Sequence, residues 1–178
     1  MNICVFCGSS TGFNPVYADS ARELGMLLAS KHHTLIYGGG NIGLMGIVAD
    51  AILEKQGRVI GVIPDFLMQK EVGHTGLTEL EIVPSMHERK KRMASLSDAF
   101  IAMPGGWGTL DETAEILTWK QLGLIHQPFG MLNVNGFFDT LLQHMNRMVD
   151  EGFLKPANLK SVKVSHTPEQ LLSLLIPQ

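Results

Sequence analysis

Two hydrophobic patterns alternate along the chain. Short apolar runs, typical of buried strands, are expected at 2–7, 34–37, 58–63, 99–103, 129–132 and 162–165. Between them apolar residues recur every three to four positions, which predicts helices from Pro15, at 42–54, 86–96, 109–122 and 137–149, and from about Pro168. This order is typical of βαβ units, so we predict the α/β class: one doubly wound domain over 1–178, with a mainly parallel sheet flanked by helices.

The segment 65–84 departs from this pattern. Its periodicity is weak and it contains Gly73 and Gly76, while 80–83 forms a short run that fits an edge strand. We predict a long functional loop here.

Composition narrows the function. The chain is 45% hydrophobic and 17% charged, with a net charge of −3. No basic field favours nucleic-acid or membrane-surface binding, and no apolar run reaches the roughly 18 residues of a membrane helix. The N-terminus lacks the pattern of a secretory leader, so we expect a cytoplasmic protein with small-molecule partners. The low charge content suggests surface hidden in a homodimer.

The metal-type residues are not arranged as a site. Cys4 and Cys7 form a C-x-x-C motif inside the first predicted strand. We interpret them as two buried thiols in a reducing compartment, the alternatives being a redox pair or half of a zinc site. The histidines lack metal-ligand spacing and are predicted at turns or on the surface, among them His74. We predict no metal site.

Glycine-rich turns follow three of the predicted strands, at 8–10, 38–43 and 104–109. In a parallel sheet such turns lie at the carboxyl edge, where backbone N–H groups and helix N-termini hold phosphate. Gly38, Gly40 and Gly43 match the G-x-G-x-x-G dinucleotide fingerprint, but the expected acid is not at the end of the next strand. Three turns together favour a mononucleotide.

The third turn combines a phosphate-binding backbone with side chains that could take part in a reaction. Thr109 places a hydroxyl beside the helix start, and Glu112 follows in the same segment. Glu112 is either a capping-box partner or a carboxylate that the reaction requires beside an anion.

A basic stretch lies in the predicted helix 86–96. Lys91 and Arg92 are predicted on a solvated face, whereas Arg89 flanks the apolar stripe. Arg89 either stays solvated with them or clamps a phosphate or a leaving group.

The stretches Met86-His87-Glu88-Arg89-Lys90 and 104–112 (Pro-Gly-Gly-Trp-Gly-Thr-Leu-Asp-Glu) resemble the paired motifs of the LOG ("lonely guy") family of cytokinin riboside 5′-monophosphate phosphoribohydrolases. Matches at 7–10, 37–40, 43–46, 97–100 and 151–153 extend the resemblance over nearly the whole chain. It implies a Rossmann-like dimer that needs no cofactor. Such an enzyme cleaves the N-glycosidic bond of AMP or of N6-substituted purine nucleoside monophosphates, releasing the base and ribose 5-phosphate.

The resemblance also implies the site residues. Arg89 and Glu112 would be the catalytic pair, and Glu115, one turn further along the same helix face, is either a second acid or a helix and dimer contact. The residues expected to bind substrate or its phosphate are Gly8, Ser9, Gly39, Gly40, Glu71, Met86, Lys90, Gly105, Gly106, Trp107, Gly108, Thr109 and Thr118.

Two other functions, amino-acid decarboxylation and non-catalytic ligand carriage, have to be considered. Amino-acid decarboxylation needs an electron sink such as PLP, for which the sequence has no binding framework. A non-catalytic carrier of nucleotides or of molybdenum cofactor would share the glycine cradle. The presence of both Arg89 and Glu112 favours an enzyme, because a carrier has no need of that acid.

Overall fold

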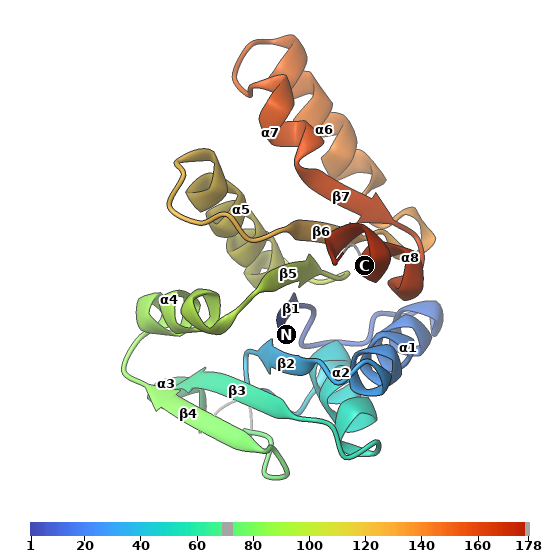
Figure 1. Cartoon of the computed structure of the whole chain (residues 1–178), viewed down its shortest axis with the longest axis vertical. Helices are drawn as coiled ribbons and strands as arrows, with labels where there is room; N and C mark the ends of the chain where they lie inside the picture. Colours follow the sequence, from blue (N-terminus) through green and yellow to red (C-terminus); the bar gives the residue numbers. More distant parts are fainter. Residues whose placement is uncertain (69–72, 177–178) are drawn as a thin grey trace.

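The computed structural model describes residues 1–68 and 73–176 and contains a seven-stranded parallel sheet (Figure 1). The strands are β1 (Asn2–Phe6), β2 (Thr34–Tyr37), β3 (Val59–Pro64), β4 (Glu79–Val83), β5 (Ala99–Ala102), β6 (Phe129–Leu132) and β7 (Val162–Ser165). Their spatial order is β4-β3-β2-β1-β5-β6-β7, and each neighbouring pair is parallel. The predicted α/β class with a doubly wound parallel sheet is confirmed.

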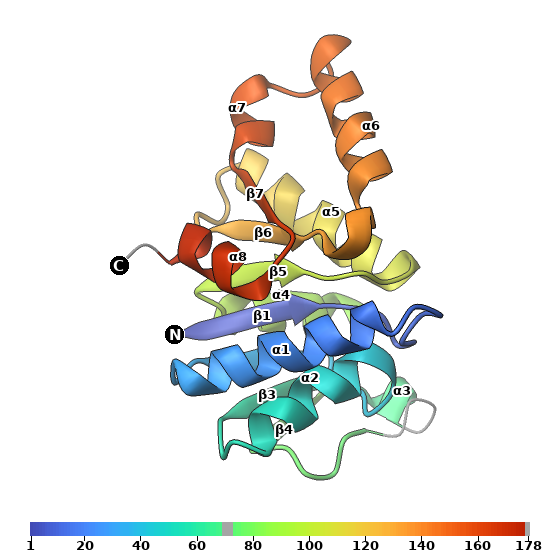
Figure 2. The same cartoon turned by 90° about the vertical axis from the view of Figure 1, so that its right-hand side faces the viewer.

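Helices cover both faces of the sheet (Figure 2). They are α1 (Val16–Ser30), α2 (Gly43–Leu53), α3 (Asp65–Met68), α4 (Met86–Leu96), α5 (Trp107–Gln121), α6 (Asp139–Asp150), α7 (Pro156–Lys160) and α8 (Pro168–Leu175), with a 3-10 turn, η1 (Val134–Gly136). One core layer joins α1, α2 and α8 to the sheet, and the other joins α4, α5 and α6 to its opposite face. Successive strand residues such as Val5 and Phe6 enter opposite layers, because side chains alternate along a strand.

The order of the strands reverses at β1. The chain adds β2, β3 and β4 on one side of β1 and then returns to place β5 on the other side. At such a switch point the loops after the two central strands diverge and leave a crevice beyond their carboxyl ends. The glycine turns after β1 and β5 meet here, where the Gly8 amide donates to the Pro104 carbonyl at 3.0 Å.

The segment 65–84 is more regular than a plain loop. The edge strand expected at 80–83 is confirmed as β4, but 65–68 forms the unpredicted helix α3, and α7 was also missed. These helices have four and five residues, too few to show a helical period. Glu71 lies in 69–72, outside the described residues.

The described residues contain neither a membrane-spanning helix nor a cluster of metal ligands. Within 1–68 and 73–176, no helix combines the length and apolarity needed to cross a membrane. The same residues hold no group of three His, Cys, Asp or Glu side chains placed to bind a metal ion. Cys4 and Cys7 are free and buried, as predicted.

Candidate active site

A cavity of about 160 Å³ lies at the switch point of the sheet. The end of β1 and its turn form one wall, Gly38 and Met45 a second, and α4 and the first turns of α5 the others. The residues that line it are Val5, Phe6, Cys7, Ser9, Gly38, Met45, Arg89, Gly106, Trp107, Gly108, Thr109 and Glu112. The cavity therefore joins all three glycine turns to the basic stretch of α4.

Arg89 brings a buried positive charge to this cavity. Its side chain is 6% exposed, and its Nε and Nη2 donate to the carbonyl oxygens of Val62 at 3.1 Å and Gly38 at 2.9 Å. A side chain at Gly38 would displace this guanidinium, because a Cβ there would lie 1.8 Å from Nη2. Among the described residues, no carboxylate lies within 4.0 Å of Arg89. Since backbone carbonyls do not neutralise the guanidinium, its charge is available to an anion in the cavity.

The start of α5 supplies backbone donors to the same space. Gly106 is the N-cap residue and offers no side-chain cap, so the first amides of the helix, at Trp107, Gly108 and Thr109, have no acceptor within the helix. A Cβ added at Gly106 or Gly108 would meet no atom within 4 Å from the described residues beyond its own chain neighbours and helix backbone. Neither glycine is required by packing, and their bare backbone leaves room for a ligand against the helix N-terminus. This arrangement binds phosphate well.

Glu112 is the acid of the cavity. Burial raises its pKa from the usual 4.5 to about 7, although the charge of Arg89 opposes the shift. The capping-box interpretation is wrong, because the N-cap residue is Gly106 and the residue three positions later is Thr109. Glu112 thus has no structural role at the helix start, and its pKa suits a group that changes protonation near neutral pH.

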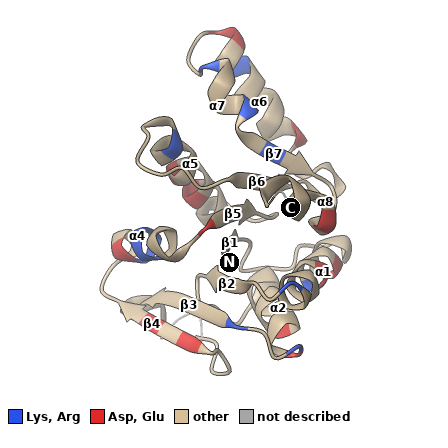
Figure 3. Ribbon diagram, in the orientation of Figure 1, with Lys and Arg blue, Asp and Glu red and all other residues tan. Residues whose placement is uncertain are grey.

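Lys90 faces a different set of partners. Its Nζ lies 3.1 Å from both Asp111 Oδ2 and Glu115 Oε2, joining α4 to α5 (Figure 3 marks the charged residues of both helices). Neither Lys90 nor Glu115 lines the cavity. The geometry agrees with the helix-contact interpretation of Glu115 and gives Lys90 an indirect route to Glu112, whose pKa its charge lowers.

The other predicted binding residues fall into three groups. Ser9, Gly106, Trp107, Gly108 and Thr109 line the cavity. Gly8, Gly39, Gly40, Met86 and Gly105 lie outside its lining but close to it: Met86 Sδ is 3.7 Å from Arg89 Nη1, and a Cβ at Gly105 would strike Thr109.

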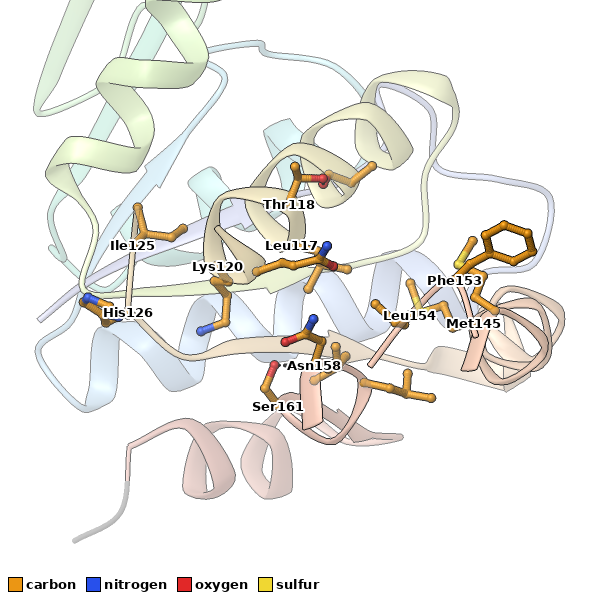
Figure 4. Close-up of a pocket in the computed structure, with 15 residues that line it drawn as sticks. Leu117, Thr118, Lys120, Ile125, His126, Met145, Phe153, Leu154, Asn158 and Ser161 are labelled. Carbon is orange, nitrogen blue, oxygen red and sulfur yellow. Dashed lines mark hydrogen bonds between the residues drawn. The ribbon is translucent and has the colours of Figure 1, made fainter. Parts of the chain in front are cut away.

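Thr118 forms the third group. It is exposed near the far end of α5, where its hydroxyl donates to the Ala114 carbonyl at 2.7 Å. There it lines a wider, mostly apolar groove between α5, α6 and α7 (Figure 4).

Sequence reasoning missed Val5, Phe6, Cys7, Gly38 and Met45 as lining residues. Gly38 and Met45 stand in or just after the second glycine turn, and that position was the available signal. Val5, Phe6 and Cys7 gave no such signal, because their apolar side chains cannot be distinguished in the sequence from ordinary core residues.

Comparison with known proteins places this chain in a family. Residues 45–175 match the family described as "possible lysine decarboxylase". A rice protein named probable cytokinin riboside 5′-monophosphate phosphoribohydrolase LOGL2 is 45% identical over 173 residues, which cover 97% of this chain and 71% of that protein. The Arabidopsis thaliana enzyme LOG1, named cytokinin riboside 5′-monophosphate phosphoribohydrolase, is 46% identical over 97% of this chain and 81% of its own length. The chain belongs to the LOG family.

Solved structures share the fold of this LOG-family chain. The molybdenum cofactor binding protein of Rippkaea orientalis superposes with a TM-score of 0.72 at 22% identity, covering 97% of this chain and 93% of that one. The molybdenum cofactor carrier protein of Chlamydomonas reinhardtii gives 0.69 at 23% identity, with 97% and 98% covered. At this identity the likeness shows a common Rossmann-like fold and nothing about the ligand.

Proposed function

We propose that the protein is a phosphoribohydrolase that cleaves the N-glycosidic bond of AMP or of N6-substituted purine nucleoside 5′-monophosphates. The observation that carries the proposal is one cavity that combines a buried cation with no carboxylate of the described residues within 4.0 Å, a helix N-terminus without a side-chain cap, and a carboxyl group with a pKa of about 7. Its LOG-family relatives carry the name of this reaction.

The charge of each group in the cavity determines the role that we propose for it. The amides at the start of α5 bind the 5′-phosphate, with Gly106 and Gly108 giving it access to the backbone. Arg89 either anchors the substrate or stabilises charge in the transition state. As the C–N bond breaks, the base leaves with the bonding electrons and takes up a proton, and the sugar becomes oxocarbenium-like.

Glu112 acts on the sugar in its ionised form. It stabilises the developing positive charge, attacks the anomeric carbon to form an ester that water then hydrolyses, or removes a proton from the water whose hydroxyl ends on that carbon. The protein's own groups suffice for these steps, so we propose that no cofactor takes part.

Incubation with AMP and, separately, with isopentenyladenosine monophosphate tests the proposal, with chromatography of the free base and a coupled assay of ribose 5-phosphate. We expect both products in equal amounts from at least one substrate. Glu112→Ala should abolish turnover yet leave phosphate-dependent binding of the nucleotide. Tight binding by the wild type without release of base from either substrate would instead support a non-catalytic nucleotide or molybdenum-cofactor carrier.

We also propose a cytoplasmic homodimer in which the groove between α5, α6 and α7 is covered by a second copy. The groove measures about 430 Å³ and is lined largely by apolar side chains. Close to it, Phe153, Leu122 and Leu124 are 85%, 64% and 67% exposed, and α6 buries only Met145. Light scattering after gel filtration should give twice the chain mass, and Phe153→Asp should shift it toward the monomer. A monomeric wild type at micromolar concentration would contradict the homodimer.

A further inference from the structure

His74 is a buried histidine that the proposed reaction leaves without a role. Only 8% of it is exposed, so of its two predicted locations, a turn or the surface, the surface is wrong. It follows the residues 69–72 and lies outside the lining of the cavity. Its position raises the question of what a polar ring does there.

Hydrogen bonds on both ring nitrogens fix the tautomer of His74. The Gly76 amide donates to Nδ1 at 3.1 Å, so Nδ1 carries no proton. Nε2 must then carry the proton in the neutral ring, and it lies 2.9 Å from Asp50 Oδ1 on α2. The neutral imidazole is thus held between a loop amide on one side and a helix carboxylate on the other.

Residues 73–78, which we call the strap, lie across the turn that follows β2. Gly73 pairs with Gly40 in an antiparallel bridge, and the His74 amide donates to the Gly39 carbonyl at 3.0 Å. At the other end of the strap, Thr78 Oγ1 accepts from the Val59 amide at 3.1 Å. His74 is therefore the point at which the strap is tied both to the turn and to α2.

The same turn holds Arg89 from its other side. The Gly38 carbonyl accepts from Arg89 Nη2, and the adjacent Gly39 carbonyl accepts from His74. Gly39 has a φ of +75°, a left-handed conformation that glycine adopts readily. Because one peptide unit separates the two acceptors, a shift of the strap at Gly39 moves the carbonyl that orients the guanidinium.

We propose that His74 is a positioning residue for the reaction: clamped between Asp50 and Gly76, it fixes the Gly38–Gly40 turn and, through it, the guanidinium of Arg89. The inference rests on the proposed function for its kinetic readout. It does not depend on which role Glu112 has in the reaction, because His74 acts only through the backbone of the turn.

Four variants separate the bonds of the clamp. His74→Phe removes both ring bonds, His74→Asn keeps an acceptor near the position of Nδ1, and His74→Gln keeps a donor near that of Nε2. Asp50→Asn removes the charge, and Asp19→Asn on α1, an exposed aspartate also on a helix, is its matched control. We expect kcat/KM to fall about tenfold in His74→Phe and less in the other clamp variants, with no change in Asp19→Asn.

A double-mutant cycle with Arg89→Lys distinguishes positioning from general damage. If His74 acts through Arg89, His74→Phe has no further effect in the Arg89→Lys background, and both single variants change the same parameter, kcat or KM. Thermal melts select an assay temperature at which every variant is folded. If His74→Phe does not fold, His74→Asn and His74→Gln enter the same cycle. Wild-type kinetics in the clamp variants, or an equal loss in both backgrounds, overturns the proposal.

The same cycle can be measured without turnover. Calorimetric titration with AMP gives the dissociation constant of each variant. If the wild type releases no base, the proposed function fails, but a coupling of His74 to Arg89 in AMP affinity still supports the clamp. Additive losses of AMP affinity overturn the clamp even where turnover is normal.

Discussion

Replacing Glu112 with glutamine should inactivate the protein and at the same time stabilise it at pH 8. The carboxyl group is largely withdrawn from water at the edge of the cavity, and burial raises its pKa from 4.5 to about 7. In the unfolded chain the same group titrates at its ordinary value. Between these two values the folded protein binds a proton that the unfolded chain has released.

The sign and size of the effect follow from that difference. Because the folded state binds more protons in this range, the free energy of unfolding falls as pH rises from 4.5 to 7 and stays reduced above 7. At about 1.4 kcal/mol for each pH unit, the ionised Glu112 costs the folded state about 3 kcal/mol. Glutamine has nearly the same shape and no charge, so Glu112→Gln should recover much of this amount at pH 8. Below pH 4.5 both proteins carry a neutral group and their stabilities should converge.

Urea unfolding at pH 4, 6 and 8 measures the difference directly. A gain of about 3 kcal/mol corresponds to a rise in Tm of about 6–12 °C for a chain of this size. Glu23→Gln, at an exposed glutamate of α1, is the control and should show little change at any pH. A Glu112→Gln variant that is no more stable than wild type at pH 8 would refute the desolvation argument.

Three further predictions concern the same cavity. The kcat/KM for AMP should rise with pH through about 7, as Glu112 ionises in the free enzyme; a profile that only falls across this range would contradict an ionised Glu112. Lys90→Met should move that rise to higher pH, since the Lys90 charge lowers the pKa of Glu112, whereas the exposed neighbour Lys91→Met should leave it in place. Gly106→Ala should weaken AMP binding at least tenfold in calorimetry while changing stability by less than about 0.5 kcal/mol. Gly105→Ala should instead lower stability by about 1–3 kcal/mol, because its Cβ would lie 2.1 Å from Thr109 Oγ1. Equal effects of the two alanines on binding and on melting would show that packing alone explains both glycines.

The fold was accessible from the sequence because its strands and long helices carry clear hydrophobic periods. The segment 65–84 was predicted less well. The edge strand β4 was located because residues 79–82 alternate in polarity, although Ile82 is 56% exposed. Elements as short as α3 depend on the chain around them and have no period of their own.

The candidate site was predicted in part, for a similar reason. The glycine turns could be located because each follows a strand, and Glu112 could be located because it follows the third turn in the same segment. The sequence could not separate Arg89 from Lys90, its neighbour on α4. The carbonyls that bury Arg89 belong to residues 27 and 51 positions away, and the carboxylates that engage Lys90 belong to α5. Tertiary contacts therefore decide which of these two side chains enters the cavity.

The separation of Arg89 from Glu112 explains how one small cavity keeps two reactive charges. If the guanidinium and the carboxylate were paired, each would neutralise the other, and the pKa of Glu112 would fall well below 7. Arg89 is instead held by the carbonyls of Val62 and Gly38, neutral acceptors for two of its N–H groups, and no carboxylate of the described residues lies within 4.0 Å to compensate its positive charge. Glu112 remains correspondingly costly to ionise. A nucleoside monophosphate brings both missing counterparts, an anion for the buried cation and a sugar that becomes positive as its base departs. Both charges are thus compensated most fully when the substrate reaches its transition state.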